Sequence, residues 1–290
     1  MQVNRRRAMN IEPLQSLERT SIFYAAMEAN IAEEVNCFGR GLPGGELHET
    51  SELTWLYTGR PYLNVVSRTH LANNDEAYAH QKIIDIIDYY KKRDQDFAWQ
   101  VNPRTQPANM GALLEAHGFT PVVHQRWMAL DIRWMNEQFS PLPNLIIKEV
   151  TDARTLKVFR DISQRGFEML LTQGQTYYDN YLANGFGPGA SWHHYIGYLD
   201  KEPVADASLL LHAGIAGVYG VATIPEVRRL GIATQMTLHA LREASKQGYR
   251  IAVLVPTDMG MNVYRRIGFQ EYSTSIIYTL SYDVMDKMYA

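Results

Sequence analysis

Residues 221–233 combine the features of a binding site for a charged ligand. The β-rich residues Val221-Ala222-Thr223 precede a short connector and the sequence Arg228-Arg229-Leu230-Gly231-Ile232-Ala233, which opens a helical pattern. Small residues at 231 and 233 let a ligand approach the backbone, and the first N–H groups of a helix have no partner within the helix. The two arginines add charge of the sign that attracts a diphosphate. The pattern predicts an anion site, with a tight turn and solvated arginines as the alternative interpretation.

An amphipathic helix is predicted after this turn. Ile232, Met236 and Ala240 recur four residues apart while charged residues fall elsewhere, so one face of the helix is expected to be buried. Gly248 marks the end of the helix, because a residue without Cβ readily takes the left-handed conformation that closes a helix. The β-rich residues 251–255 follow. The sequence thus predicts a strand, a turn, a helix and a second strand in succession.

A second motif follows this strand, with the sequence Tyr264-Arg265-Arg266-Ile267-Gly268-Phe269. Together with Arg228-x-x-Gly231-x-Ala233, it resembles the acetyl-CoA-binding core of the Gcn5-related N-acetyltransferase (GNAT) family. The resemblance depends on the order of strand, turn, long helix, strand and short helix ending in Tyr-x-x-x-Gly-Phe. Neither motif alone would be specific.

The composition is that of a globular protein without extreme charge. The chain has 290 residues, which favours two domains over one, and a formal net charge of −3, which predicts no general attraction to nucleic acid. The single Cys37 excludes an internal disulfide and offers no metal-site spacing. No apolar run approaches the roughly 18 residues that span a bilayer. We therefore expect a cytoplasmic protein that binds neither a membrane nor a metal.

The first half of the chain repeats the order of elements found around Val221. After a helix at residues 20–34, the patterns predict strands at 53–58 and 62–71, a long helix capped within Asn73-Asn74-Asp75, a strand at 97–101, a short helix at 110–117 and a strand at 122–132. Met110-Gly111 and Gly118-Phe119 correspond to Met259-Gly260 and Gly268-Phe269. We interpret this as an internal repeat. A proline-containing linker at 136–144 then separates two domains, 1–140 and 145–290.

The first copy lacks the residues that make the second copy a candidate site. No glycine precedes its long helix, and Leu114 stands where the second copy has Tyr264. Residues 1–140 therefore resemble a GNAT domain that has lost its cofactor site. The glycine-rich residues 39–45 are predicted to form a surface loop, because they lack the Gly-Lys-Ser/Thr sequence of a phosphate-binding loop.

The second copy carries the full order of elements of the GNAT fold. Its patterns predict a strand at 145–150, helices at 153–169 and 176–183, and strands at 192–199, 203–212 and 215–223. The resemblance implies an α/β fold class in which each copy is a mostly antiparallel twisted sheet flanked by helices.

The resemblance also assigns the residues that would bind acetyl-CoA. The backbone of Val221, Ala222 and Thr223 would pair with the pantetheine arm like an added strand. The diphosphate would be held by Arg228, Arg229, Leu230, Gly231, Ile232, Ala233 and Thr234. Backbone N–H groups in the gap beside this strand would stabilise the oxyanion of a tetrahedral intermediate.

Tyr264 is the candidate general acid for the departing sulfur, with packing against Gly268-Phe269 as the alternative. The general base is left open, because the position at which many relatives have a glutamate is Gly217 here. The alternatives are Tyr219, His194, Asp206, His212 or a relaying water. His193 and His194 do not form a metal pair, since adjacent strand residues point to opposite faces.

The implied function is transfer of the acetyl group of acetyl-CoA, as co-substrate, to a primary amine of a small molecule or peptide by direct attack. The sequence leaves the acceptor open, although Tyr177-Tyr178 and Tyr181 fit an aromatic or cationic amine as well as simple packing. The protein would be a monomer or a homodimer. Three alternatives remain: a non-catalytic acyl-CoA sensor, an acyltransferase for a longer acyl chain, and a scaffold in which the cofactor turn has no function.

Overall fold

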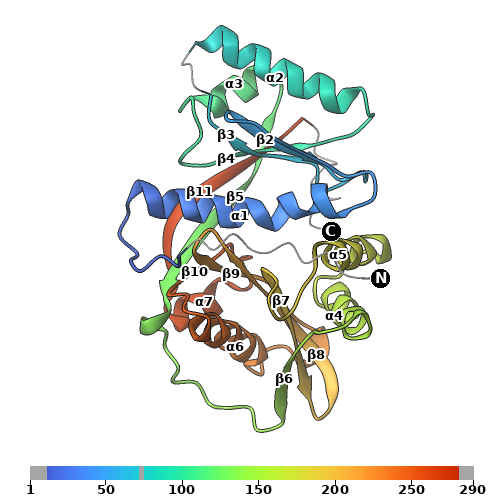
Figure 1. The fold of residues 1–290 in the computed structure, drawn as a ribbon, viewed down its shortest axis with the longest axis vertical. Coiled ribbons are helices and arrows are strands. Elements are labelled where there is room, and N and C mark those ends of the chain that lie inside the picture. The colour runs from blue at the N-terminus through green and yellow to red at the C-terminus, as the bar shows by residue number, and fades with distance from the viewer. Residues whose placement is uncertain (1–11, 72–74, 281–290) are drawn as a thin grey trace. The chain divides into compact units, whose positions relative to one another are not determined.

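The computed structural model of the chain describes residues 12–71 and 75–280 (Figure 1). It has the predicted α/β fold class, with helices on a mixed sheet. The contacts divide the chain into two compact units. Unit 1 contains the described residues up to Glu34 and the segment from Trp127 to Tyr272, and unit 2 contains the segment from Val35 to Arg126 and the described residues from Ser273 onward.

The two units do not follow the predicted boundary at the linker. The helix α1 (Ser21–Gly41) and the strands β5 (Thr120–Asp131) and β11 (Gln270–Thr279) each contribute residues to both units. Each half of the sequence therefore supplies elements to the unit built mainly by the other half. The assignment of residues 1–140 as a degenerate domain and 145–290 as a catalytic domain stays a prediction.

Unit 1 is built on a sheet that is antiparallel except for one pair of strands. Its strands are β6 (Leu145–Glu149), β7 (Trp192–Leu199), β8 (Glu202–His212), β9 (Ile215–Thr223), β10 (Ile251–Leu254) and the end of β5. They lie in the order β6-β7-β8-β9-β10-β5, and β9 and β10 are the parallel pair. The helices are α1, α4 (Ala153–Gly166), α5 (Leu171–Asn184), α6 (Ile232–Lys246) and α7 (Met261–Ile267), with short 3-10 turns at Ile132–Trp134 and Pro225–Val227.

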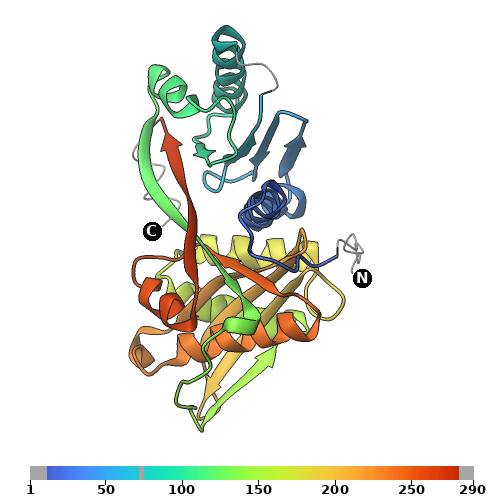
Figure 2. The same cartoon turned by 90° about the vertical axis from the view of Figure 1, so that its left-hand side faces the viewer.

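Helices cover both faces of this sheet (Figure 2). Asp206 on β8 accepts a hydrogen bond from Ser163 on α4. Gly197 on β7 faces Met236 on α6, since a Cβ added at this glycine would lie 2.8 Å from the Met236 sulfur. Gly197 pairs with Ala205, the neighbour of Asp206, and successive strand residues point to opposite faces. The helices α4 and α6 therefore pack on opposite faces.

The helix α6 confirms the prediction made from its apolar spacing. Ile232, Met236, Ala240 and Ala244 are all buried, with at most 1% of their surface exposed. The helix ends at Lys246, and Gly248 takes a positive φ of 85° just beyond it, as expected of a helix-terminating glycine.

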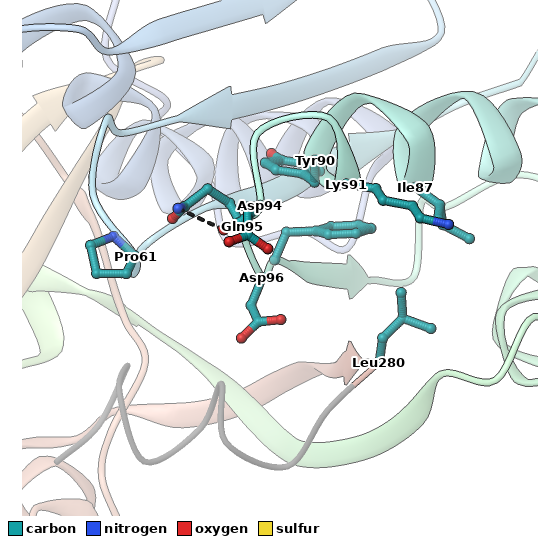
Figure 3. Close-up of a pocket in the computed structure, with 9 residues that line it drawn as sticks. Pro61, Ile87, Tyr90, Lys91, Asp94, Gln95, Asp96 and Leu280 are labelled. Atoms are coloured by element: carbon teal, nitrogen blue, oxygen red, sulfur yellow. Dashed lines mark hydrogen bonds between the residues drawn. The ribbon is translucent and has the colours of Figure 1, made fainter.

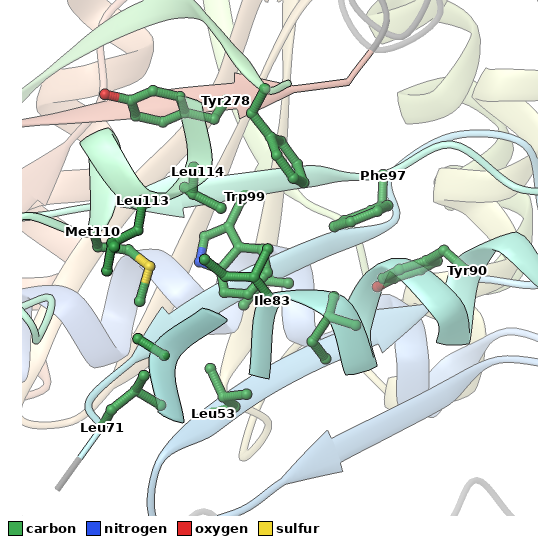
Figure 4. Close-up of a cluster of buried hydrophobic side chains, with 14 residues drawn as sticks. Leu53, Leu71, Ile83, Tyr90, Phe97, Trp99, Met110, Leu113, Leu114 and Tyr278 are labelled. Atoms are coloured by element: carbon green, nitrogen blue, oxygen red, sulfur yellow. The ribbon is translucent and has the colours of Figure 1, made fainter. Parts of the chain in front are cut away.

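Unit 2 has the sheet order β1-β2-β3-β4-β11, in which β3 and β4 are parallel. Its elements are β1 (Glu46–Glu49), β2 (Leu53–Tyr57), β3 (Val65–Thr69), α2 (Glu76–Lys91), β4 (Ala98–Val101) and α3 (Met110–Ala116). The core between α2, α3 and the sheet contains the rings of Tyr90, Phe97 and Trp99 (Figure 4). The rings of Tyr90 and Phe97 stack at 4.2 Å.

Several predicted boundaries were wrong for local reasons. The helix α1 continues through Gly39 to Gly41, so part of the predicted glycine-rich loop is helical. Gly39 lets the helix pack closely against β1, since a Cβ at this position would lie 2.8 Å from the Glu46 carbonyl oxygen. The helix α5 begins at Leu171, five residues before the predicted start, because the Gln173 side chain accepts a hydrogen bond from the Leu170 amide at 2.8 Å.

Two further expectations concern the long helix of unit 2 and membranes. Asp75 caps α2 as predicted by accepting a hydrogen bond from the Ala77 amide at 3.0 Å, whereas Asn73 and Asn74 lie outside the described residues. In the part of the chain that the structure describes, no helix combines the length and the apolar character required to cross a bilayer.

Candidate active site

The strands β9 and β10 separate after two residue pairs. They are in register only at Ala216 with Ala252 and at Gly217 with Val253, and β9 then continues to Thr223 while β10 ends at Leu254. The structure therefore has the separation of parallel strands that the resemblance implied beside residues 221–223.

A β-bulge bends β9 at the point of separation. Ser208 on β8 pairs with Tyr219, whereas Asp206, two residues earlier, pairs with Ala222, so Gly220 and Val221 together stand opposite Ala207. Gly220 has a positive φ of 54° and is exposed. Bulges of this kind redirect backbone groups and often occur at active sites.

The turn after β9 presents unpaired amides to solvent. Gly231 begins α6 in a left-handed conformation with φ 89°, and no side chain caps the helix. The N–H groups of residues 231–234 donate no hydrogen bond to any other described residue. A Cβ added at Gly231 would find no atom within 4 Å. This helix end is therefore open for an anion.

The two arginines of the turn have different roles. The Arg228 guanidinium donates to the Thr223 carbonyl oxygen at 3.1 Å and to the Gly166 carbonyl oxygen at 2.7 Å, so it ties the turn to α4. Arg229 is exposed, with a left-handed φ of 65°. The resemblance implied that both arginines bind the diphosphate. Of the two side chains, only that of Arg229 makes no hydrogen bond or ion pair with a described residue.

Thr223 adds a buried hydroxyl without a partner at the end of β9. Its Oγ1 makes no hydrogen bond to another described residue. Such a group is costly unless a ligand or water satisfies it. Val221 beside it is half-buried, and Ala222 is buried against α4, where a Cβ added at Gly166 would lie 2.7 Å from the Ala222 Cβ.

Tyr264 lies on α7 with its ring packed and its hydroxyl unpaired. A Cβ added at Gly260 would lie 2.9 Å from its Cε2, and its ring meets the Phe269 ring edge-on with centroids 6.0 Å apart. The hydroxyl makes no hydrogen bond to a described residue. Burial raises the pKa of the Tyr264 phenol to about 12. The ring thus satisfies the packing interpretation, and the protonated hydroxyl stays available for the acid role.

Three of the side chains considered as general bases are poorly suited to that role. Tyr219 donates its proton to Asn30 Oδ1 at 2.8 Å, and burial raises the pKa of its phenol. Burial also raises the pKa of the Asp206 carboxyl, which accepts a hydrogen bond from Ser163. Burial lowers the pKa of His194 to about 3, so its imidazole is a weak base. His212 is half-buried at the end of β8.

Sequence reasoning missed two polar residues on α1. Asn30 is fully buried, and Glu34 is half-buried in a setting that raises the pKa of its carboxyl to about 7. Both lie on the side of the helix whose apolar residues Phe23 and Met27 pack on the sheet of unit 1. Asn30 and Glu34 follow Met27 by three and seven residues, so both fall on an otherwise apolar face of the helix. This break in the apolar pattern could have indicated a functional role for them.

A pocket in unit 2 contains none of the predicted site residues (Figure 3). Its volume is about 470 Å³, and it is lined by Pro61, Ile87, Tyr90, Lys91, Asp94, Gln95, Asp96, Phe97 and Leu280. The carboxylates of Asp94 and Asp96 would repel a diphosphate. This pocket therefore does not compete with the open turn of unit 1 as the cofactor site.

Part of the chain matches a known protein domain. The model of the acetyltransferase (GNAT) domain matches residues 212–272, which include β9, the open turn, α6, β10 and α7. A search of curated protein sequences finds no significant match.

Solved structures extend the likeness to most of the chain. A GCN5-related N-acetyltransferase from Kribbella flavida has a TM-score of 0.66 at 20% identity and covers 86% of this chain and 93% of its own. One from Sphaerobacter thermophilus has a TM-score of 0.63 at 14% identity, with 88% and 92% covered. A tandem GNAT protein from the clavulanic acid biosynthesis pathway has a TM-score of 0.59 at 14% identity, with 92% and 97% covered. The chain thus has the GNAT fold, and its residues 212–272 match the model of the acetyltransferase (GNAT) domain.

Proposed function

We propose that the protein is an N-acetyltransferase that transfers the acetyl group of acetyl-CoA to a primary amine. The observation that carries this proposal is the continuity of the separated strand β9 with the unpaired amides of residues 231–234. The first feature accommodates an extended acyl carrier, and the second accommodates its diphosphate. The family match over residues 212–272 supports the same activity.

The residues present fit acetyl-CoA. The backbone edge of Val221, Ala222 and Thr223 would hold the pantetheine arm, and the unpaired Thr223 hydroxyl offers one more polar contact. The amides of Gly231, Ile232, Ala233 and Thr234, together with the exposed Arg229 side chain, would hold the diphosphate. Arg228 and Leu230 would shape the turn. When bound, acetyl-CoA supplies the activated acetyl group as a thioester.

The chain's own groups would assist the transfer at two points. The bulge at Gly220–Val221 interrupts the pairing of β9 with β8 close to the point where β9 leaves β10, and an N–H donor there would stabilise the oxyanion. Tyr264 would donate its phenolic proton to the departing sulfur. A pKa of about 12 keeps this phenol protonated across the neutral range, and it also makes Tyr264 a weaker acid than an exposed tyrosine.

The test is release of free thiol from acetyl-CoA over a panel of primary amines, aminoglycosides, polyamines and peptide N-termini. The proposal predicts acceptor-dependent thiol release and an acetylated amine detected by mass spectrometry. Binding of coenzyme A without turnover of any acceptor would instead favour a sensor. A series of acyl-CoA chain lengths with the best acceptor separates an acetyltransferase from an enzyme for longer chains.

A further inference from the structure

The cofactor strand has no room for a basic side chain at the position where many relatives of this fold family have one. A Cβ added at Gly217 would lie 2.2 Å from Asn30 Oδ1 and 2.3 Å from Tyr219 Cε2. Both distances are far shorter than van der Waals contact. The side chains of Asn30 and Tyr219 therefore occupy the space that any larger residue at 217 would need.

Asn30 and Tyr219 fix α1 against the sheet of unit 1. The Tyr219 hydroxyl donates to Asn30 Oδ1 at 2.8 Å, and the Asn30 amide donates to the carbonyl oxygens of His212 and Ile215 at 3.0 Å each. Asn30 is completely buried and Tyr219 is 9% exposed. The Asn30 amide group thus accepts one of these hydrogen bonds and donates two, and together they determine which side of the helix faces β9.

Glu34 lies one helical turn after Asn30 and on the same side of α1. Glu34 is half-buried. Burial, and after it the nearby charge of Glu34, raises the pKa of the Tyr219 phenol, so the two side chains lie near each other. Tyr219 precedes the bulge at Gly220 and Val221 directly. Glu34 therefore lies one helical turn from the Asn30 side chain that holds Tyr219, the residue next to the bulge near which the acyl group would lie.

We propose that Glu34, a residue of the first helix in the chain, is the general base of the reaction and accepts a proton from the acceptor ammonium. This proposal rests on the proposed acetyltransferase function. The ammonium gives one proton to the Glu34 carboxylate, which releases it to water. The neutral nitrogen forms the C–N bond in a tetrahedral intermediate, whose collapse breaks the C–S bond. Tyr264 would give its proton to the departing thiolate, and the second proton of the nitrogen would restore the phenol. One proton therefore leaves to solvent in each turnover.

The environment of Glu34 suits this role. Burial raises the pKa of its carboxyl to about 7, so the carboxylate is a much stronger base than an exposed glutamate and is still largely ionised just above neutral pH. The other charged group that acts on the Tyr219 phenol is Glu33, which also lies on α1.

The test compares Glu34→Gln with the neighbouring control Glu33→Gln, using the amine that gives the fastest thiol release. We expect Glu34→Gln to lower kcat/KM on the order of 100-fold at pH 7.5 and to remove the fall in kcat/KM below about pH 7 that the wild type shows. Glu34→Asp should restore part of the rate, and Glu33→Gln should stay within about threefold of the wild type. Coenzyme A affinity should be unchanged in all three variants, as measured by calorimetry.

Wild-type rates and an unchanged acid limb in Glu34→Gln would overturn the assignment of the base while leaving the acetyltransferase function intact. An equal loss in Glu33→Gln and Glu34→Gln would also overturn it, because the effect would then be one of general charge. If the wild type binds coenzyme A but acetylates no amine, the proposed function fails first, and the role of Glu34 fails with it.

Discussion

The two copies of the strand, helix, strand and short helix differ most where each long helix begins. In unit 1, α6 begins at Gly231 with unpaired amides and no acidic residue in its first turn. In unit 2, α2 begins at Asp75, whose carboxylate accepts a hydrogen bond from the Ala77 amide, and Glu76 follows. The acidic cap occupies one of the donors that an anionic ligand would use and adds repulsion. A favourable helix cap is thus incompatible with a diphosphate site.

The gap between the parallel strands also differs. The strands β3 and β4 are in register at only two pairs, as are β9 and β10. In unit 2, however, the indole of Trp99 donates to the Thr69 hydroxyl at 2.9 Å, and the Thr69 carbonyl oxygen accepts from the Gln106 amide. The corresponding residue of β10 is Val253, and the Thr223 hydroxyl of β9 has no partner among the described residues. A side-chain hydrogen bond thus joins β4 to the end of β3 in unit 2, whereas Val253 cannot make such a bond in unit 1.

The short helices show what the two copies share. In each, the phenylalanine amide donates to a carbonyl oxygen five residues earlier at 3.1 Å, Phe119 to Leu114 and Phe269 to Tyr264. Leu114 is fully buried in the core of unit 2, whereas Tyr264 keeps an unpaired hydroxyl. The Gly-Phe ending is therefore a structural element of the fold, and the copies differ in the residue four positions before its glycine.

The largest effect is expected from separating the two halves of the sequence. A fragment of residues 145–290 lacks the end of β5, which pairs with β10, and the α1 residues Phe23 and Met27, which pack against Ile251 and Val253. Domains are stable by only roughly 5–15 kcal/mol, so the loss of a paired strand and of buried core side chains is a large fraction of that stability. We expect no cooperative thermal transition by circular dichroism. A cooperative transition together with coenzyme A binding would show that the halves are independent.

The next largest effect should come from giving α6 the acidic cap of α2. Gly231→Asp places a carboxylate beside the diphosphate site, and we expect coenzyme A affinity to fall on the order of 100-fold in calorimetry. Gly231→Asn is the matched control, because asparagine has the same size and tolerates the left-handed conformation. It should cost no more than about tenfold. Equal losses in both variants would indicate that shape rather than charge distinguishes the copies.

Replacing Tyr264 tests the difference between the short helices. Tyr264→Phe removes only the hydroxyl, so we expect kcat to fall about 10- to 100-fold with unchanged coenzyme A affinity and a thermal midpoint near that of the wild type. Because burial raises the pKa of the phenol to about 12, the wild type should show no loss of activity from ionisation of Tyr264 between pH 7 and 10. A variant as fast as the wild type with a good acceptor would remove Tyr264 from the mechanism.

The smallest effects should separate the two arginines of the turn. Arg228→Ala leaves the carbonyl oxygens of Thr223 and Gly166 without their donor, and we expect a loss of about 1–3 kcal/mol in the free energy of unfolding. Arg229→Ala should leave stability unchanged and weaken coenzyme A binding about three- to tenfold, less so at high salt. Urea denaturation and calorimetry measure the two quantities. The reverse pattern would exchange their roles.

The sequence predicted local structure well and long-range pairing poorly. The spacing of Ile232, Met236 and Ala240 predicted α6, and the positions of Gly231 and Gly248 predicted its limits, because these signals lie within a few residues of the structure they determine. Periodicity does not show which sheet a strand joins, so the sharing of β5 and β11 between the units was missed. For the same reason the contacts of Asn30 with β8 and β9, and of Arg228 with the Gly166 carbonyl oxygen, were not predicted.

Calorimetric titration of the full-length chain with coenzyme A tests the central claim most directly. The difference between the helix starts at Gly231 and Asp75 predicts one molecule of coenzyme A bound per chain. Two molecules per chain would contradict the account, because the acidic cap of α2 would then not exclude the ligand. No heat at high micromolar coenzyme A, with folded protein, would contradict it as well, because the open turn of unit 1 would not be a cofactor site.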